Sequence, residues 1–215
     1  NNALNENIDI MKHAIKNGFS RFLIMPPAYY KYGDQECYKF FSSLIEKVPE
    51  SEIILYNFEK LSGYKFSLTI VEKLVKNFPK QILGVKDSSY NLYETIKIPN
   101  FLIFPGSETK LLKGLELGCS GIISAICNVT APLARKVYDD FHNKKKQTYN
   151  EKLCRIRSVF DNYNLISGLH SFMSIEDEKY KRVLPPLDLL SDVQQKELIF
   201  KLKELKFFPE KNIAA

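Results

Sequence analysis

A lysine stands where a buried strand would end. The stretch "ILGVKDSSY", residues 82–90, runs from apolar residues directly into Lys86, an aspartate and two serines. A lysine at the mouth of an apolar site loses part of its hydration, and desolvation favours the neutral amine, which is a nucleophile. Such an amine attacks a ketone to form a Schiff base, and the protonated imine accepts electrons when a neighbouring C–C bond breaks or forms. The residue types therefore indicate imine chemistry at Lys86, unless this side chain lies just beyond its strand and points to solvent.

Other polar and aromatic residues follow the neighbouring candidate strands. Tyr56 lies one strand earlier than Lys86, near enough in a parallel sheet for its phenol to relay protons. Taken alone, a tyrosine at such a position is more often a residue at the edge of the core than an acid. The remaining strand-end residues are Tyr29, Tyr30, Asn57, Asp87, Ser107, Glu108, Ser124 and Asn128. Polar groups gathered at the C-terminal ends of parallel strands are typical of a barrel active site.

These residues depend on a repeated unit of one strand and one helix. The alternation of short apolar runs with amphipathic segments predicts parallel strands joined by helices. Because no Gly-rich phosphate-binding turn follows the first strand, we favour a β/α barrel over a doubly wound sheet. Strands are expected at 20–25, 52–56, 82–86, 101–105 and 121–125, in that spatial order, and helices at 5–18, 33–48, 67–78, 90–97, 108–118 and 131–144.

After residue 144 the alternation stops, and three further helices are predicted at 145–166, 167–176 and 191–206. We therefore predict an α/β fold with a partial β/α barrel over residues 1–144. Helices over residues 145–215 would pack on the barrel, as a single domain overall. At the helix ends, Asp34 and Ser67 are predicted N-caps, and Gly18 and Gly118 are predicted C-terminal stops.

Composition and charge narrow the classes of function. The chain of 215 residues is 45% hydrophobic and carries a net charge of +6, which is ordinary for a globular protein. Lysines alternate with glutamates along the predicted helices, and the densest basic cluster, residues 142–152, is predicted to be a solvated connection. We therefore expect no nucleic-acid binding. No apolar run reaches the roughly 18 residues of a membrane span, and we expect neither a membrane segment nor a signal peptide.

Cysteine and histidine positions bear on location and cofactors. The four cysteines are scattered without a CxxC pair, which indicates free thiols in a reducing cytoplasm. His13, His142 and His170 are far apart along the chain, and none follows a predicted strand. We expect no metal, flavin or nucleotide.

Six motifs occur in order along the chain: "MPPAYYK", "ILYNFEKLSG", "GVKDSS", "FPGSETKLL", "GCSGIISAICNV" and "RVLPPLDLL". Together they resemble the pyruvate-dependent class I aldolases of the dihydrodipicolinate synthase and N-acetylneuraminate lyase superfamily. The resemblance runs through nearly all of the chain and implies a (β/α)8 TIM barrel. Only about five C-terminal β/α units are recognisable here, so the N-terminal part of that barrel is expected to be missing.

By that resemblance, Lys86 forms a covalent imine with pyruvate or another 2-keto acid, without a further cofactor, and Tyr56 relays protons. The resemblance also implies substrate-binding roles for Leu61, Ser62, Ser107, Glu108, Ile123 and Ser124. Tyr29 or Tyr30 matches an aromatic residue that relatives insert across a subunit interface, which implies a homo-oligomer, a dimer or tetramer. Both tyrosines could equally be packing residues.

Two departures from the family pattern bear on activity. Leu61 stands where dihydrodipicolinate synthases usually carry an arginine, and a leucine cannot make a bidentate contact with a substrate carboxylate. The neighbouring Lys60 would point another way. The Gly-Thr-Thr-Gly-Glu type of loop that follows strand two in the family, and binds the keto-acid carboxylate, has no counterpart. This chain alone is therefore expected to be catalytically incomplete.

The sequence thus favours a carbon–carbon lyase that acts on a small-molecule 2-keto acid, similar to sialic-acid lyases or 2-keto-3-deoxy sugar acid aldolases. One alternative is the 4-hydroxy-tetrahydrodipicolinate synthase of lysine biosynthesis, against which Leu61 argues. Another is a non-catalytic ligand-binding relative or an inactive fragment. The presence of both Lys86 and Tyr56 argues against a non-catalytic relative, because a sensor has no need of an imine-forming lysine.

Overall fold

The structure is a computed structural model that describes residues 2–208. The chain divides into two compact units. Residues 1–106 and 116–122 form the first unit, and residues 107–115 and 123–215 form the second. The expected organisation, with a partial barrel over 1–144 and helices over 145–215, stays a prediction.

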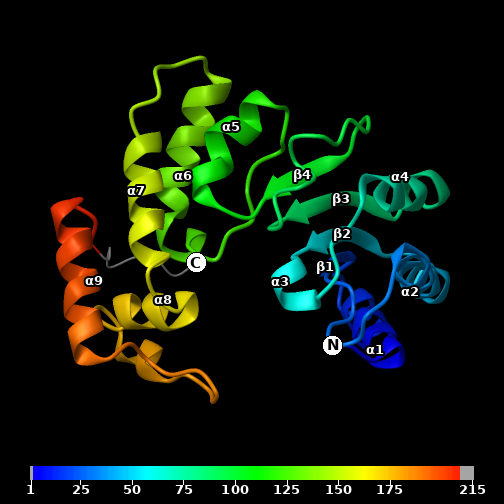
Figure 1. Ribbon diagram of the computed structural model, residues 1–215, viewed down its shortest axis with the longest axis horizontal. Coiled ribbons are helices and arrows are strands. Elements are labelled where there is room, and N and C mark those ends of the chain that lie inside the picture. The colour runs from blue at the N-terminus through cyan, green and yellow to red at the C-terminus, as the bar shows by residue number, and fades with distance from the viewer. Residues whose placement is uncertain (1, 209–215) are drawn as a thin grey trace. The chain divides into compact units, whose positions relative to one another are not determined.

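The first unit is built on a parallel sheet of four strands in the order β1-β2-β3-β4 (Figure 1). The strands are β1 (Arg21–Ile24), β2 (Glu52–Asn57), β3 (Ile82–Asp87) and β4 (Leu102–Pro105). All three pairings are parallel, as the alternation of strands and helices predicted. The predicted order of these strands is therefore confirmed.

Helices cover one face of this sheet. They are α1 (Leu4–Lys16), α2 (Asp34–Lys47) and α4 (Leu68–Asn77), and a short α3 (Glu59–Ser62) follows β2. Phe41 and Leu44 of α2 and Leu74 of α4 are fully buried against Leu55 and Val85 of the strands. Each such side chain stabilises the fold by about 1.5–3 kcal/mol. Because successive strand residues point to opposite faces, this core also fixes which strand residues face the other way.

Three of the four predicted helix caps and stops lie where the sequence placed them. Ser67 caps α4, because its Oγ accepts a hydrogen bond from the N–H of Ile70 at 3.2 Å. The cap of α2 is Gly33, so the predicted cap Asp34 is instead the first helical residue. Gly18 and Gly118 have φ of +86° and +89°, as expected of residues that end helices.

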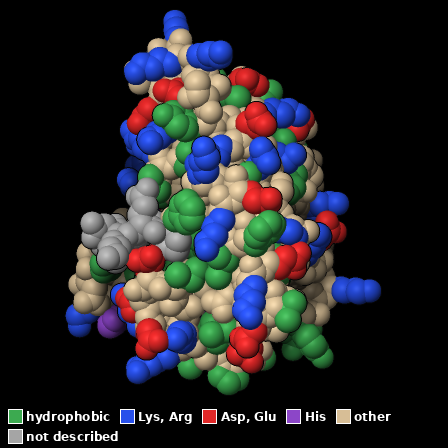
Figure 2. All heavy atoms as spheres, turned by 90° about the vertical axis from the view of Figure 1, so that its left-hand side faces the viewer, with side chains coloured by type: hydrophobic (Ala, Val, Ile, Leu, Met, Phe, Trp, Pro, Cys, Tyr) green, Lys and Arg blue, Asp and Glu red, His purple; other side chains and the backbone are tan. Residues whose placement is uncertain are grey.

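The second unit is helical. Its elements are η1 (Glu108–Lys110), α5 (Leu111–Glu116, whose last residue belongs to the first unit), α6 (Cys127–His142), α7 (Asn150–Phe160), α8 (Leu165–Met173), η2 (Glu178–Lys181) and α9 (Asp192–Glu204). Ile126, Ile156, Phe160, Phe172 and Leu198 form the centre of its core. Lys144, Lys145 and Lys146 are exposed between α6 and α7, which confirms the predicted solvated connection. Elsewhere on the face drawn in Figure 2, basic and acidic side chains are interspersed.

Two predicted elements are wrong. Residues 121–125 form no strand, because after Ser120, whose N–H donates to Ile103 O at 2.9 Å, no backbone hydrogen bond of the described residues continues the ladder. Residues 90–97 form turns rather than a helix, because the Asp87 carboxylate accepts the N–H groups of Tyr90, Leu92 and Tyr93. No helix of the described residues is long and apolar enough to cross a membrane.

Candidate active site

Lys86 and Tyr56 lie side by side on neighbouring strands. The register of β2 and β3 pairs Tyr56 with Lys86, and the Lys86 Nζ lies 3.9 Å from the centre of the Tyr56 ring. Both side chains are half-buried, on the face opposite to the helices. The predicted convergence of these two residues from adjacent strands is therefore confirmed. A cation over an aromatic face is stabilised by about 0.5–2 kcal/mol, so the Tyr56 ring helps to hold the Lys86 amine in place.

The residues expected near this pair on α3 differ in accessibility. Leu61 is 57% exposed. Ser62 is buried, and its Oγ lies 3.1 Å from Phe58 O, 2.9 Å from Tyr64 O and 3.2 Å from Tyr64 N. The Ser62 hydroxyl therefore holds the turn after α3 together.

Tyr29 and Tyr30 are the most exposed of the predicted site residues. They are 88% and 69% exposed, and their rings meet edge to face with centroids 5.1 Å apart. Tyr29 has a φ of +81°, an uncommon conformation for a residue with a side chain. An exposed aromatic pair on a strained turn suits contact with a partner, which leaves the interface prediction open.

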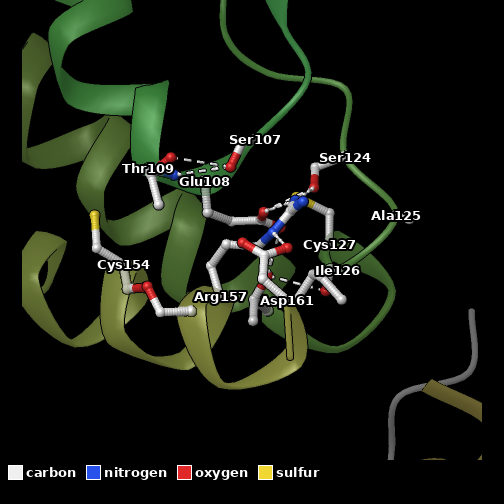
Figure 3. Close-up of polar contacts among 12 residues, drawn as sticks. Ser107, Glu108, Thr109, Ser124, Ala125, Ile126, Cys127, Cys154, Arg157 and Asp161 are labelled. Atoms are coloured by element: carbon white, nitrogen blue, oxygen red, sulfur yellow. Dashed lines mark hydrogen bonds and ion pairs between the residues drawn. The ribbon is translucent and has the colours of Figure 1, made fainter. Parts of the chain in front are cut away.

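Two predicted site residues of the second unit, Glu108 and Ser124, meet in a network around the buried Glu108 carboxylate (Figure 3). Glu108 has no exposed area, and its oxygens accept hydrogen bonds from four side chains. These are Ser124 Oγ at 2.7 Å, Arg157 Nη1 at 3.0 Å, Thr130 Oγ1 at 3.2 Å and Cys127 Sγ at 3.4 Å. The Glu108 carboxylate is thus fully engaged inside its own unit. We name these five residues the Glu108 cluster.

Arg157 was not foreseen from the sequence. Its Nη1 also contacts Ser124 Oγ at 3.1 Å, and its Nε donates to Asp161 at 2.8 Å. Burial opposes the charge of Arg157, but its hydrogen bonds to Glu108 and Asp161 outweigh that effect and raise its pKa. Burial together with the nearby Glu108 raises the pKa of the Cys127 thiol to about 12. No signal in the sequence sets Arg157 apart, because α7 also carries Lys152 and Arg155.

Ser107 and Ile123 are the first residues of the two chain segments that make up the second unit. Ser107 is the N-cap of η1, and its Oγ accepts a hydrogen bond from the N–H of Thr109 at 3.3 Å. Ile123 is half-buried and lies outside regular structure. Within the described residues, no group of three or more His, Cys, Asp or Glu side chains could hold a metal ion.

Known proteins match this chain over most of its length. The model of the dihydrodipicolinate synthetase family matches residues 1–205. An uncharacterized DapA-like lyase of Chloroflexus aurantiacus is 32% identical over 147 residues, which are 65% of this chain and 49% of that protein. An N-acetylneuraminate lyase of Actinobacillus pleuropneumoniae is 31% identical over 63% of this chain and 47% of its own length. The chain thus spans about half the length of these curated relatives.

The synthases are also among the matches. A 4-hydroxy-tetrahydrodipicolinate synthase of Acaryochloris marina is 26% identical over 70% of this chain and 52% of that protein. The fold matches the crystal structure of YagE, a prophage protein of the dihydrodipicolinic acid synthase family from E. coli K12, in complex with pyruvate. That match has a TM-score of 0.86 at 22% identity and covers 96% of this chain and 73% of YagE. The fold is therefore that of the family's TIM barrels, of which this chain covers about three quarters. With a parallel β/α sheet, paired Lys86 and Tyr56, and a family match over residues 1–205, the chain belongs to the dihydrodipicolinate synthetase family.

Proposed function

We propose that the protein is a class I aldolase that forms a Schiff base between Lys86 and a 2-keto acid. The observation that carries this proposal is the Lys86 Nζ, half-buried at the end of β3 and 3.9 Å from the ring centre of Tyr56. A lysine so placed is sheltered by an aromatic face yet open enough to meet a small substrate. The match to a family of named lyases supports the class of reaction.

The proposed reaction uses the amine and the phenol in turn. The neutral Lys86 amine attacks the keto carbon, and the carbinolamine loses water to give a protonated imine. Tyr56 gives its phenol proton to the departing carbinolamine hydroxyl, and the resulting phenolate then takes the proton from the substrate's C4 hydroxyl, so that this oxygen becomes a carbonyl as the C3–C4 bond breaks. The electron pair of that bond moves into the imine, which becomes an enamine. Protonation of the enamine at C3 and hydrolysis then release pyruvate and regenerate the lysine.

Ser124 supports a hydroxylated substrate. Its Oγ donates its hydrogen to Glu108 and accepts from Arg157, so only a lone pair remains for a ligand. A lone pair suits a substrate hydroxyl, which can donate, and disfavours a carboxylate, which cannot. Leu61 likewise offers no charge to a second carboxylate. We therefore propose that the substrate is a hydroxylated 2-keto acid rather than one with a second carboxylate.

The second candidate reaction is that of the 4-hydroxy-tetrahydrodipicolinate synthases, one of which is 26% identical over 70% of this chain. Leu61 in place of arginine argues against it. An inactive or ligand-binding relative is the third candidate.

We further propose that the protein forms a homo-oligomer and lies in the cytoplasm. The exposed aromatic pair of Tyr29 and Tyr30 supports the oligomer, and four free cysteines support the reducing location.

The test is chemical trapping on the longest natural form of the protein. Pyruvate and borohydride should leave a reduced pyruvyl adduct on Lys86, identified by intact mass and peptide mapping. Lys86→Ala should carry no adduct, whereas Lys60→Ala, which removes an exposed lysine on the neighbouring α3, should carry it in full. Equal trapping by Lys86→Ala would assign the chemistry to another amine.

A further inference from the structure

Asn57 and Asp87, the last residues of β2 and β3, make a buried pair directly behind the candidate active site. They are register partners, one residue beyond the pair of Tyr56 and Lys86. Because strand side chains alternate, they lie on the opposite face of the sheet. Both have no exposed area. We propose that Asn57 and Asp87 are positioning residues that set Lys86 against Tyr56, an inference that rests on the proposed function.

Asp87 is a buried carboxylate held by four N–H donors. Oδ1 accepts from the amide of Asn57 at 2.8 Å and from Tyr90 N at 2.9 Å. Oδ2 accepts from Leu92 N at 2.8 Å and Tyr93 N at 2.9 Å. Within the part of the chain that the structure describes, no lysine, arginine or histidine forms an ion pair with it. A buried charge without a counter-ion is stable only when its hydrogen bonds are complete, so its position is tightly defined.

Asn57 extends the same network to the other loop. Its amide also donates to Asn91 Oδ1 at 2.8 Å, and its Oδ1 accepts from Phe66 N at 3.1 Å. The backbone closes the arrangement, because Ser88 N donates to Asn57 O at 2.8 Å and Gly106 N donates to Asp87 O at 3.0 Å. The loops that follow β2 and β3, and the end of β4, are thus tied to the two strand ends that carry the reactive side chains.

The reactive pair has no such tie of its own. Within the described residues, no hydrogen bond joins Lys86 Nζ to Tyr56 Oη, and the side chains meet through the contact of the ammonium with the ring. The backbone therefore sets their separation. Since a shift of about 1 Å in reacting groups can cost on the order of 100-fold in rate, a loosened strand end is expected to slow the chemistry.

Asn57→Ala tests the proposal, with Asn91→Ala as the matched control. Each substitution removes one amide of the same network, but Asn91→Ala leaves the bond between Asn57 and Asp87 intact. We expect similar losses of thermal stability. Imine formation with pyruvate should slow by about 10–100-fold in Asn57→Ala, with a smaller change in KM. In Asn91→Ala it should stay near the unmodified rate. Asn57→Ser, which keeps a hydroxyl for Asp87 or Phe66 N, is a second variant if Asn57→Ala does not fold.

A second readout needs no substrate. Competitive labelling with acetic anhydride, analysed by mass spectrometry, reports the reactivity of Lys86 relative to the exposed Lys12 of α1 across pH. The Lys86 profile should change in Asn57→Ala and not in Asn91→Ala. If the unmodified protein traps no pyruvate, the proposed function fails, and the labelling profile still decides the positioning role. If the Lys86 profile is the same in all three proteins, or if both variants change it equally, the pair is structural and the inference is overturned.

Discussion

Removing Arg157 is the sharpest test of the Glu108 cluster. The Glu108 side chain has no exposed area and that of Arg157 is 12% exposed, so this is a buried ion pair. Breaking such a pair by removing one partner typically costs about 3–5 kcal/mol, because a charge is left buried without compensation. In Arg157→Ala, Ser124, Thr130 and Cys127 still donate to the carboxylate. We therefore expect a loss near the lower end, about 3 kcal/mol.

The chain offers a matched control at Arg135. It pairs with Asp139 at 2.9 Å, but the two side chains are 70% and 45% exposed. Exposed pairs contribute about 0–1 kcal/mol, so Arg135→Ala should lose no more than that. For a chain of this size, about 1 kcal/mol corresponds to a shift in Tm of about 2–4 °C. Arg157→Ala should therefore lower Tm by about 6–12 °C, followed by far-ultraviolet circular dichroism, with the free energies taken from urea unfolding.

A compensating double variant separates charge from packing. Glu108→Gln with Arg157→Met removes both charges and keeps much of the volume, and such replacements of buried pairs are often neutral. The double variant should regain most of the stability that Arg157→Ala loses. The reasoning is refuted if Arg157→Ala costs no more than Arg135→Ala, or if the double variant is as unstable as Arg157→Ala.

Three further predictions concern chemistry. Tyr56→Phe should still form the imine but turn over about 10²–10⁴-fold more slowly, and unchanged turnover would make Tyr56 a packing residue. The protein should have a higher kcat/KM for a hydroxylated 2-keto acid than for condensing pyruvate with aspartate semialdehyde. Loss of a charge-assisted contact at Leu61 costs on the order of 2–5 kcal/mol, which Leu61→Arg should partly restore for the semialdehyde. A semialdehyde kcat/KM above about 10⁴ M⁻¹s⁻¹ without turnover of sugar acids would contradict this. The Cys127 thiol, with its pKa raised to about 12, stays protonated at neutral pH and should resist iodoacetamide until the protein unfolds.

Local patterns in the sequence were sufficient to predict the four strands of the first unit and their order. Four of the five predicted strands form within two residues of their expected bounds, because a short apolar run between turn signals is itself the property that a buried parallel strand requires. The pairing of Tyr56 with Lys86 followed from the same frame, since consecutive parallel strands end at one edge of a sheet. The cap at Ser67 was equally local, because a cap needs only its own helix.

The predicted strand at 121–125 and the predicted helix at 90–97 show where local sequence patterns fail to predict the structure. Both segments have suitable side chains, but a strand exists only when a neighbour completes its hydrogen bonds. The segment after β3 is bent by the Asp87 carboxylate, which accepts three backbone N–H groups that a helix would have directed elsewhere. In both places the partner, rather than the segment's own sequence, decides the conformation.

The side-chain networks were decided only by the tertiary structure. Arg157 lies 49 positions from Glu108, and Asn57 lies 30 positions from Asp87. Periodicity describes which face of an element is apolar, but it does not state which two polar groups meet once elements pack. The sequence predicts Glu108 as a carboxylate at the end of a strand. In the structure its carboxylate is buried against Arg157 and three uncharged donors, which are Ser124, Cys127 and Thr130. The sequence alone determined four of the strands, their order and the pairing of Lys86 with Tyr56. Only packing determined which charges are neutralised and which hydroxyls keep a free lone pair, because burial makes an unpaired polar group costly and so forces distant residues together.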